Sequence, residues 1–248
     1  MQPAAAIHWF EELDSTNAEA RRMADAGEDG PLWIAARRQT AGRGRRGRAW
    51  ETGQGNLAAT LLLTLDRTPA EAAQLSFVAA LAVGDLARRF APAASVGNKW
   101  PNDVLLEGRK LAGVLIESGR REDGRLWLAI GVGVNLASAP EGTEFPAISL
   151  ASVQAPPTPE EALGVLAEAM ADRIALWTAS GFPAVRQAWL EHAHGLGASC
   201  TARLPAESVE GVAEGLDTDG ALLLRLADRR VRRITAGDIF FGPSASSG

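Results

Sequence analysis

The chain has 248 residues, 46% of them hydrophobic and 22% charged, and its net charge at pH 7 is −5. This length and apolar content can build one sizeable core and a small second one, and they exclude a disordered chain. The acidic balance argues against a general nucleic-acid binder, and the single cysteine, Cys200, excludes an internal disulfide and a metal site of several thiolates.

The first part of the chain is predicted to alternate strands with helices. Residues 1–13 are typical of a short strand, and the segment DSTNAEARRMADAG that follows begins a helix. Ser15 or Thr16 can cap this helix, and Thr16 with Glu19 fits a capping box. Strands are predicted over 32–40 and 56–65, and apolar residues at helical spacing predict a long helix over 69–90.

The rest of the chain is predicted to hold two more strands, two helices and a separate β domain. The strands cover 110–118 and 125–136, and the helices cover 158–179 and 182–193. After that point short strands alternate with turns such as DTDG, a pattern typical of a small SH3-like barrel. We therefore expect an α/β sheet domain over 1–195 and a barrel over 196–248. No apolar run reaches membrane-spanning length and no signal peptide is evident, so we expect a cytoplasmic protein.

A segment rich in glycine and arginine, QTAGRGRRGRAW, covers residues 39–50 and is called the arginine loop below. Gly42, Gly44 and Gly47 match the dinucleotide pattern G-x-G-x-x-G, but that pattern needs a following helix, and a turn and a strand are predicted here. The loop could instead bind nucleic acid, wrap a small phosphorylated ligand, or be a solvated hairpin. Because its positive charges repel one another, we expect it to be mobile without ligand and ordered with one.

The chain contains only two lysines among its 25 basic residues, Lys99 and Lys110, and both lie in KWPNDVLLEGRKLAG. Arginine serves wherever only a positive charge is needed, so a retained lysine indicates a site that needs a compact ammonium group. Asn102 and Asp103 beside the stiff Pro101 can bind a ribose, a metal or an arginine, or can form an ordinary turn bond or ion pair. An ordinary ion pair for Lys99 and a chance origin of the two lysines also stay open.

Together these motifs resemble those of biotin protein ligases. DSTN, QTAGRGRRGRAW, KWPND, RKLAGVLIE and GVGVNL occur in the order found in that family and span nearly the whole chain. The resemblance implies an α+β fold in which helices flank a mixed β-sheet, the class II synthetase-like biotin/lipoate ligase fold, with a small C-terminal SH3-like β-barrel. It also implies a monofunctional ligase, since the first motif begins at Asp14 and leaves no room for the N-terminal DNA-binding domain of bifunctional relatives.

The resemblance implies that biotin is activated by ATP to biotinyl-5′-AMP and then joined to a lysine of the biotin carboxyl carrier domain of a carboxylase. Biotin would contact small and polar residues: Ser15, Thr16, Asn17, Gln39, Gly44, Lys110, Gly113 and Gly133. ATP would contact Arg43, Gly44, Arg45, Arg48, Trp50, Asn102, Asp103 and Asn135. The expected catalytic residues are Lys110, Arg43 and Arg45, with Lys110 neutralising the biotin carboxylate and the α-phosphate as the new bond forms.

Magnesium would accompany ATP as a co-substrate ion and bridge the leaving pyrophosphate, while its protein ligands stay unassigned. The same resemblance predicts no membrane and no DNA partner, and it allows a weak homodimer. Many relatives cover the adenine with an aromatic residue after the GVN strand, where this chain has only Phe145 between 137 and 149. An octanoyl or lipoyl transferase or ligase is the alternative enzyme, and a nucleic-acid-binding module that uses residues 37–48 is the alternative without catalysis.

Overall fold

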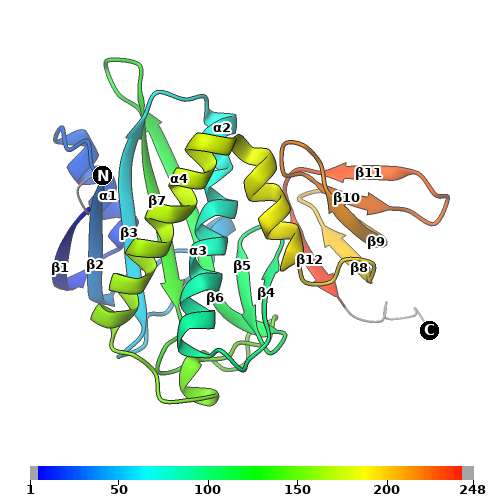
Figure 1. Cartoon of the computed structure of the whole chain (residues 1–248), viewed down its shortest axis with the longest axis horizontal. Coiled ribbons are helices and arrows are strands. Elements are labelled where there is room, and N and C mark those ends of the chain that lie inside the picture. Colours follow the sequence, from blue (N-terminus) through cyan, green and yellow to red (C-terminus); the bar gives the residue numbers. More distant parts are fainter. Residues whose placement is uncertain (1–4, 242–248) are drawn as a thin grey trace.

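The computed structural model describes residues 5–241, which form a seven-stranded sheet with helices and a second sheet of five strands (Figure 1). Residues 1–4 of the first predicted strand and residues 242–248 of the predicted barrel lie outside the described range. The larger sheet has the strand order β1-β2-β3-β7-β6-β5-β4. Its strands are β1 (Ala6–Leu13), β2 (Leu32–Gln39), β3 (Leu57–Leu65), β4 (Val96–Lys99), β5 (Asp103–Leu106), β6 (Arg109–Arg120) and β7 (Leu126–Val134).

The larger sheet is mixed, as expected. β1 pairs with β2 in parallel, because the crossover through α1 (Thr16–Asp25) returns the chain to the same end, and all other neighbours are antiparallel. The five predicted strands are confirmed. The hairpin of β4 and β5 was not predicted, because each strand has only four residues and the motif residues between them conceal the alternation.

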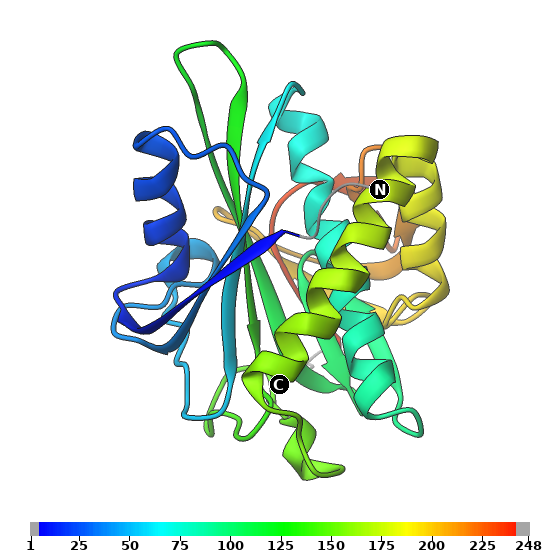
Figure 2. The ribbon, with the colours of Figure 1, turned by 60° about the vertical axis from the view of Figure 1, so that its left-hand side comes forward.

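Helices cover both faces of the larger sheet (Figure 2). α1 lies on one face, and α2 (Pro69–Ala73), α3 (Leu75–Phe90) and α4 (Pro159–Glu191) lie on the other. The helix predicted over 69–90 divides at Gln74 into α2 and α3. The two helices predicted further on form the two arms of α4, which is kinked at Gly181, where φ is 68° and a helical hydrogen-bond pattern cannot continue.

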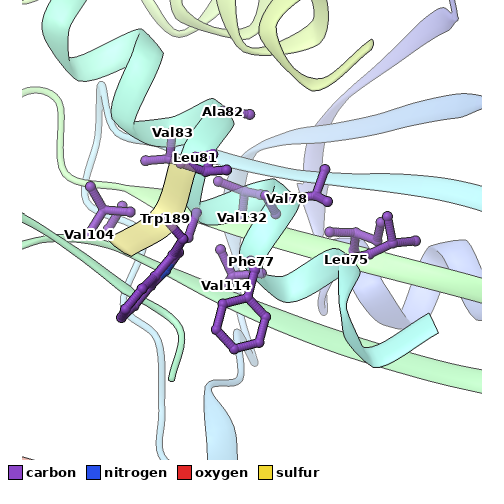
Figure 3. Close-up of a cluster of buried hydrophobic side chains, with 14 of the residues drawn as sticks. Leu75, Phe77, Val78, Leu81, Ala82, Val83, Val104, Val114, Val132 and Trp189 are labelled. Carbon is purple, nitrogen blue, oxygen red and sulfur yellow. The ribbon is translucent and has the colours of Figure 1, made fainter. Parts of the chain in front are cut away.

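The main core lies between α3, α4 and the sheet. Phe77 and neighbouring residues of α3 pack in one cluster with valines of β5, β6 and β7 and with Trp189 of α4 (Figure 3). Within the described residues, 69–90 is the one helical stretch long and apolar enough to cross a membrane, yet 67% of its 18-residue apolar window is buried. Its hydrophobicity is therefore explained by packing between two layers.

The C-terminal strands form a separate antiparallel sheet in the order β11-β10-β9-β8-β12. They are β8 (Ser199–Arg203), β9 (Ser208–Leu216), β10 (Leu222–Arg225), β11 (Val231–Ile234) and β12 (Asp238–Phe241). The small β domain is confirmed, but over the described residues β11 and β12 are the two edges, so the hydrogen bonding leaves the predicted barrel open. The predicted domain boundary after residue 195 falls between α4 and β8.

The turn between β9 and β10 fixes the small sheet against the large domain. The indole Nε1 of Trp100 donates a hydrogen bond of 3.0 Å to the carbonyl of Gly220, and Arg186 of α4 donates one of 2.9 Å to the carbonyl of Leu216. Gly220 has a positive φ of 91°, and a Cβ there would lie 2.7 Å from the ring of Phe77. This close approach needs glycine.

Candidate active site

A cavity of about 380 Å³ lies on the same face of the large sheet as α1, beside the N-terminus of that helix. β7 shows why it forms there: Trp127 and Ala129 pack under α1, and the next residues on that face are Gly131 and Gly133. All fifteen predicted site residues line the cavity: Ser15, Thr16, Asn17, Gln39, Arg43, Gly44, Arg45, Arg48, Trp50, Asn102, Asp103, Lys110, Gly113, Gly133 and Asn135.

The floor of the cavity is a trough of small residues in one row across the sheet. Ala58 of β3 pairs with Gly133 of β7, which pairs with Gly113 of β6. Since neighbouring strands lie about 4.8 Å apart, this part of the row is about 10 Å wide. The row then continues to Asp103 of β5 and Lys99 of β4, so the trough has an apolar floor and a charged end.

The indole of Trp50 lies over this floor. A Cβ on Gly133 would be 2.2 Å from Trp50 Cε2, and one on Gly113 would be 3.4 Å from Trp50 Cζ3. The space above these two glycines, which were expected to contact biotin, is thus occupied in part by a side chain of the arginine loop. Trp50 therefore forms a wall of the cavity that any ring bound here must contact or displace.

Lys110 reaches the cavity because β6 contains a bulge. Val104 of β5 pairs with Ala112 and the next residue, Leu105, pairs with Lys110, so Leu111 is an extra residue in β6. In a regular strand Lys110 and Gly113 would point to opposite faces, but the bulge brings them to the same one. A Cβ on Gly113 would lie 3.5 Å from Lys110 Nζ, which confirms that the amine is aimed at the trough.

Asp103 lies between the two lysines of the chain. Its Oδ1 is 2.7 Å from Lys110 Nζ, and its Oδ2 is 3.7 Å from Lys99 Nζ. The neighbouring amides have structural bonds as well: Asn102 accepts a hydrogen bond of 3.3 Å from Arg45, and Asn135 donates one of 3.4 Å to the carbonyl of Lys110. The motif residues thus lie together at the charged end of the cavity.

The opposite end of the cavity is polar but uncharged. Thr16 Oγ1 donates to Gln39 Oε1 at 3.2 Å, and the hydroxyl of the buried Thr60 donates to Asn17 Oδ1 at 2.7 Å and lies 2.8 Å from Thr16 Oγ1. The predicted capping box is wrong: Ser15 is the N-cap residue of α1 and makes no side-chain cap bond, while Thr16 faces Gln39. Ser15 instead lines the cavity.

The arginine loop is a hairpin held to the C-terminal sheet. The Gly44 N–H donates to the carbonyl of Arg48 at 2.7 Å, and the turn between them is the short 3-10 helix η1 (Arg45–Gly47), so no long helix follows the glycines. Asp238 of β12 pairs with Arg46 at 3.1 Å, with Arg48 at 2.9 Å and with Arg45 at 3.8 Å. The prediction that the loop arginines repel one another did not take this carboxylate into account, because it lies 192 residues away from Arg46 in the chain.

Replacing Asp238 with asparagine should loosen the arginine loop. Three guanidinium groups would lose one partly buried carboxylate, at a cost of about 1–2 kcal/mol. In the absence of nucleotide, we expect trypsin to cut the variant within 43–48 about ten times faster than it cuts the wild type. Mass spectrometry maps the cleavage sites. Asp228→Asn is the control, because Asp228 pairs with Arg230 on an exposed turn of the same sheet. Equal cleavage rates in both variants would mean that Asp238 does not restrain the loop.

Within the described residues, neither the cysteine nor a metal-binding cluster contributes to the cavity. Cys200 is buried in β8 away from the cavity, and burial raises the pKa of its thiol. Among residues 5–241 no three His, Cys, Asp or Glu side chains are grouped closely enough to hold a metal ion. Sequence reasoning also missed Asp238 and Phe240, which line the cavity, and Thr60, whose hydroxyl contacts Thr16 and Asn17.

Comparison with known proteins assigns the chain to one family. The sequence profile of the Biotin/lipoate A/B protein ligase family matches residues 9–135, and that of the Biotin protein ligase C terminal domain matches 195–242. A biotin–[acetyl-CoA-carboxylase] ligase of Paracoccus denitrificans is 47% identical over 237 residues, which cover 92% of this chain and 98% of the relative. The bifunctional ligase/repressor BirA of Bacillus subtilis is 31% identical and matches over 93% of this chain and 72% of its own length.

Solved structures show the same fold. The biotin protein ligase of Leishmania major in complex with biotinyl-5-AMP is 27% identical, with a TM-score of 0.69 over 95% of this chain and 100% of that one. The biotin protein ligase of Aquifex aeolicus in complex with biotin and ATP has a TM-score of 0.81 at 24% identity, over 96% of this chain and 98% of that one.

Proposed function

The chain belongs to the biotin/lipoate A/B protein ligase family, and on that premise we propose that it is a biotin protein ligase. It activates biotin with ATP to biotinyl-5′-AMP and pyrophosphate, and it transfers the biotin to a lysine of a biotin carboxyl carrier domain. One observation carries the proposal: a trough that is polar and uncharged at one end closes at the other on Lys110, beneath the arginine loop.

The uncharged end suits the ureido ring of biotin, which carries two N–H groups and one carbonyl. Hydroxyl and amide groups of Ser15, Thr16 and Gln39 can complement such a ring, with Asn17 beside them. Thr60 holds Thr16 and Asn17 in place from behind. Leaving one of these buried groups unpaired costs about 1–3 kcal/mol, so the pocket discriminates against acids without a ureido ring.

In the first step an oxygen of the biotin carboxylate attacks the α-phosphorus of ATP, and pyrophosphate leaves. Two anions must approach each other, so catalysis needs positive charge where they meet. Lys110 lies at the end of the trough for this purpose, and Arg43, Arg45 and Arg48 bind phosphate oxygens from the loop. Gly44 lets the loop backbone approach the ligand. Magnesium brought with ATP would supply positive charge to the leaving pyrophosphate.

The nucleotide itself lies at the charged end of the row. Asn102, Asp103 and Asn135 line that side of the cavity, and Trp50 forms its apolar wall. In the second step the neutral amine of the carrier lysine attacks the carbonyl carbon of biotinyl-AMP, AMP leaves, and the amine loses a proton. Much of this rate can come from positioning, while the arginine loop shields the mixed anhydride from water.

The assignment as a biotin protein ligase also implies the protein partner that receives the biotin. It is the carrier domain of a biotin-dependent carboxylase, and the reaction takes place in the cytoplasm without a membrane or DNA partner. The acidic net charge of −5 supports the absence of a nucleic-acid partner. A weak homodimer and the division into domains at residue 195 stay part of the proposal.

The competing enzyme assignments are an octanoyl or lipoyl transferase or ligase. A transferase with a catalytic thiol is disfavoured, because Cys200 is buried in β8 and does not line the cavity. The test supplies biotin, octanoate or lipoate with MgATP and follows pyrophosphate release, then acylation of a purified apo carrier domain by mass spectrometry. We expect release with biotin alone and a mass increase of one biotin on the carrier. Release with octanoate or lipoate in preference to biotin would overturn the proposal.

A further inference from the structure

Lys99 is a buried cation that the proposed reaction does not yet use. It is the last residue of β4 and pairs in register with Asp103, at the charged end of the row that forms the trough floor. Its side chain is 6% exposed, against 28% for Lys110. The two lysines of this arginine-rich chain therefore meet at one carboxylate, with Lys110 at 2.7 Å from Oδ1 and Lys99 at 3.7 Å from Oδ2.

Aromatic rings cover the ammonium of Lys99 on its other sides. The Phe145 ring centroid is 4.1 Å from Nζ, and that of Phe240 is 5.8 Å away. Residues of the site fix both rings. The Lys110 N–H donates to the carbonyl of Pro146 and the Ile148 N–H donates to the carbonyl of Lys110, which fixes the segment after Phe145. Phe240 belongs to β12, close to Asp238. Such contacts partly compensate a cation for lost water.

This position is costly for a charged group. Burial lowers the pKa of Lys99, against the attraction of Asp103, which raises it. A lysine needed only for surface charge or solubility would lie in water, where its ammonium group is fully hydrated. The cost therefore indicates that the charge serves its neighbours, and the polar neighbour it faces is Asp103.

Asp103 needs a second cation because Lys110 has two tasks. In the empty site Lys110 neutralises Asp103, but during adenylation the same amine must face the biotin carboxylate and the α-phosphate. Without Lys99 the shift would leave a largely buried carboxylate unpaired and close to two substrate anions, which is strongly unfavourable. With Lys99 the group of three carries a net charge of +1, and Asp103 keeps a partner throughout.

We propose that Lys99 is a positioning residue that holds the carboxylate of Asp103 while Lys110 turns toward the substrates, so that Lys110 is free to stabilise the acyl phosphate. The inference rests on the proposed function, since it assigns Lys110 to the adenylation step. Lys99 acts through Asp103 and does not touch the reacting atoms. A lysine that merely joins β4 to β5 would affect stability and leave the chemical step unchanged.

The test is a double-mutant cycle between Lys99→Met and Asp103→Asn, read as single-turnover biotinyl-AMP formation with thermal unfolding in parallel. We expect Lys99→Met to lower the rate at saturating substrates by about 10- to 100-fold, with the KM for biotin changed less than about twofold. In the Asp103→Asn background the same substitution should change the rate by less than about twofold, because the carboxylate that it serves is gone.

Further variants separate this role from folding. Lys99→Arg keeps the charge and should retain clearly more activity than Lys99→Met, and it replaces that variant if Lys99→Met fails to fold. Arg109→Met, an exposed cation next to Lys110, should match the wild type. A wild-type rate in Lys99→Met, or an equal loss with and without Asp103, would overturn the inference. Failure of the proposed function would appear separately, as a wild-type protein that releases no pyrophosphate with biotin.

Discussion

Biotinyl-AMP formation is expected to fall by about 100- to 1000-fold when Lys110 is replaced by alanine. The amine is the cation that the bulge in β6 aims into the trough, 2.7 Å from Asp103 and 3.5 Å from the position of a Cβ on Gly113. Removing it takes positive charge from the point where carboxylate and phosphate meet, and it takes the nearer of two cations from Asp103 beside them. Pre-steady-state pyrophosphate release at saturating biotin and ATP measures the effect.

Two variants control for other causes of such a loss. Lys110→Arg keeps the charge but not the compact ammonium, so we expect it to recover only part of the rate. Arg109→Ala removes an exposed cation one residue earlier and should leave the rate unchanged. If Lys110→Ala retained more than about a tenth of the wild-type rate while the protein stayed folded, Lys110 could not be the main electrostatic contact of the first step.

A methyl group at position 133 is expected to weaken biotin binding by about 5- to 150-fold, the equivalent of 1–3 kcal/mol of overpacking. A Cβ on Gly133 would lie 2.2 Å from Trp50 Cε2, so the indole and its loop must move away from the trough. The floor would also rise beneath the ligand. Isothermal titration of the Gly133→Ala protein with biotin measures the loss.

Gly113→Ala is the matched control, since it adds the same methyl group one strand away on the same row. Its Cβ would meet Trp50 and Lys110 at 3.4–3.5 Å, which is close to ordinary contact, so we expect a much smaller loss of affinity. Equal losses in the two variants would show that the ligand, and not Trp50, meets the added methyl groups. Unchanged affinity in Gly133→Ala would exclude biotin from this part of the trough.

The two lysines illustrate how far residue choice can be interpreted from sequence. An arginine-rich chain that retains lysine at two positions predicts a need for a compact ammonium group there. In the structure both amines face Asp103, at the charged end of one cavity. The sequence argument could not distinguish their roles, because the burial of Lys99 depends on Phe145 and on Phe240 of the other sheet.

Sequence alone determined the order of most strands and helices and the identity of fifteen residues that line one cavity. It could do so because alternation, helical spacing and turn residues are local signals, and because five motifs in a family's order are a specific combination. The signals were weakest where an element was short: β4 and β5 have four residues each and went unpredicted.

Tertiary structure alone decided how these residues are aimed. The bulge that turns Lys110 to the same face as Gly113 arises from pairing with β5, and the carboxylate that binds the loop arginines comes from β12, 192 residues beyond Arg46. Thr60 belongs to an apolar strand in sequence, yet its hydroxyl holds Thr16 and Asn17. Side-chain direction and long-range ion pairs depend on which strands become neighbours, and no local pattern encodes that choice.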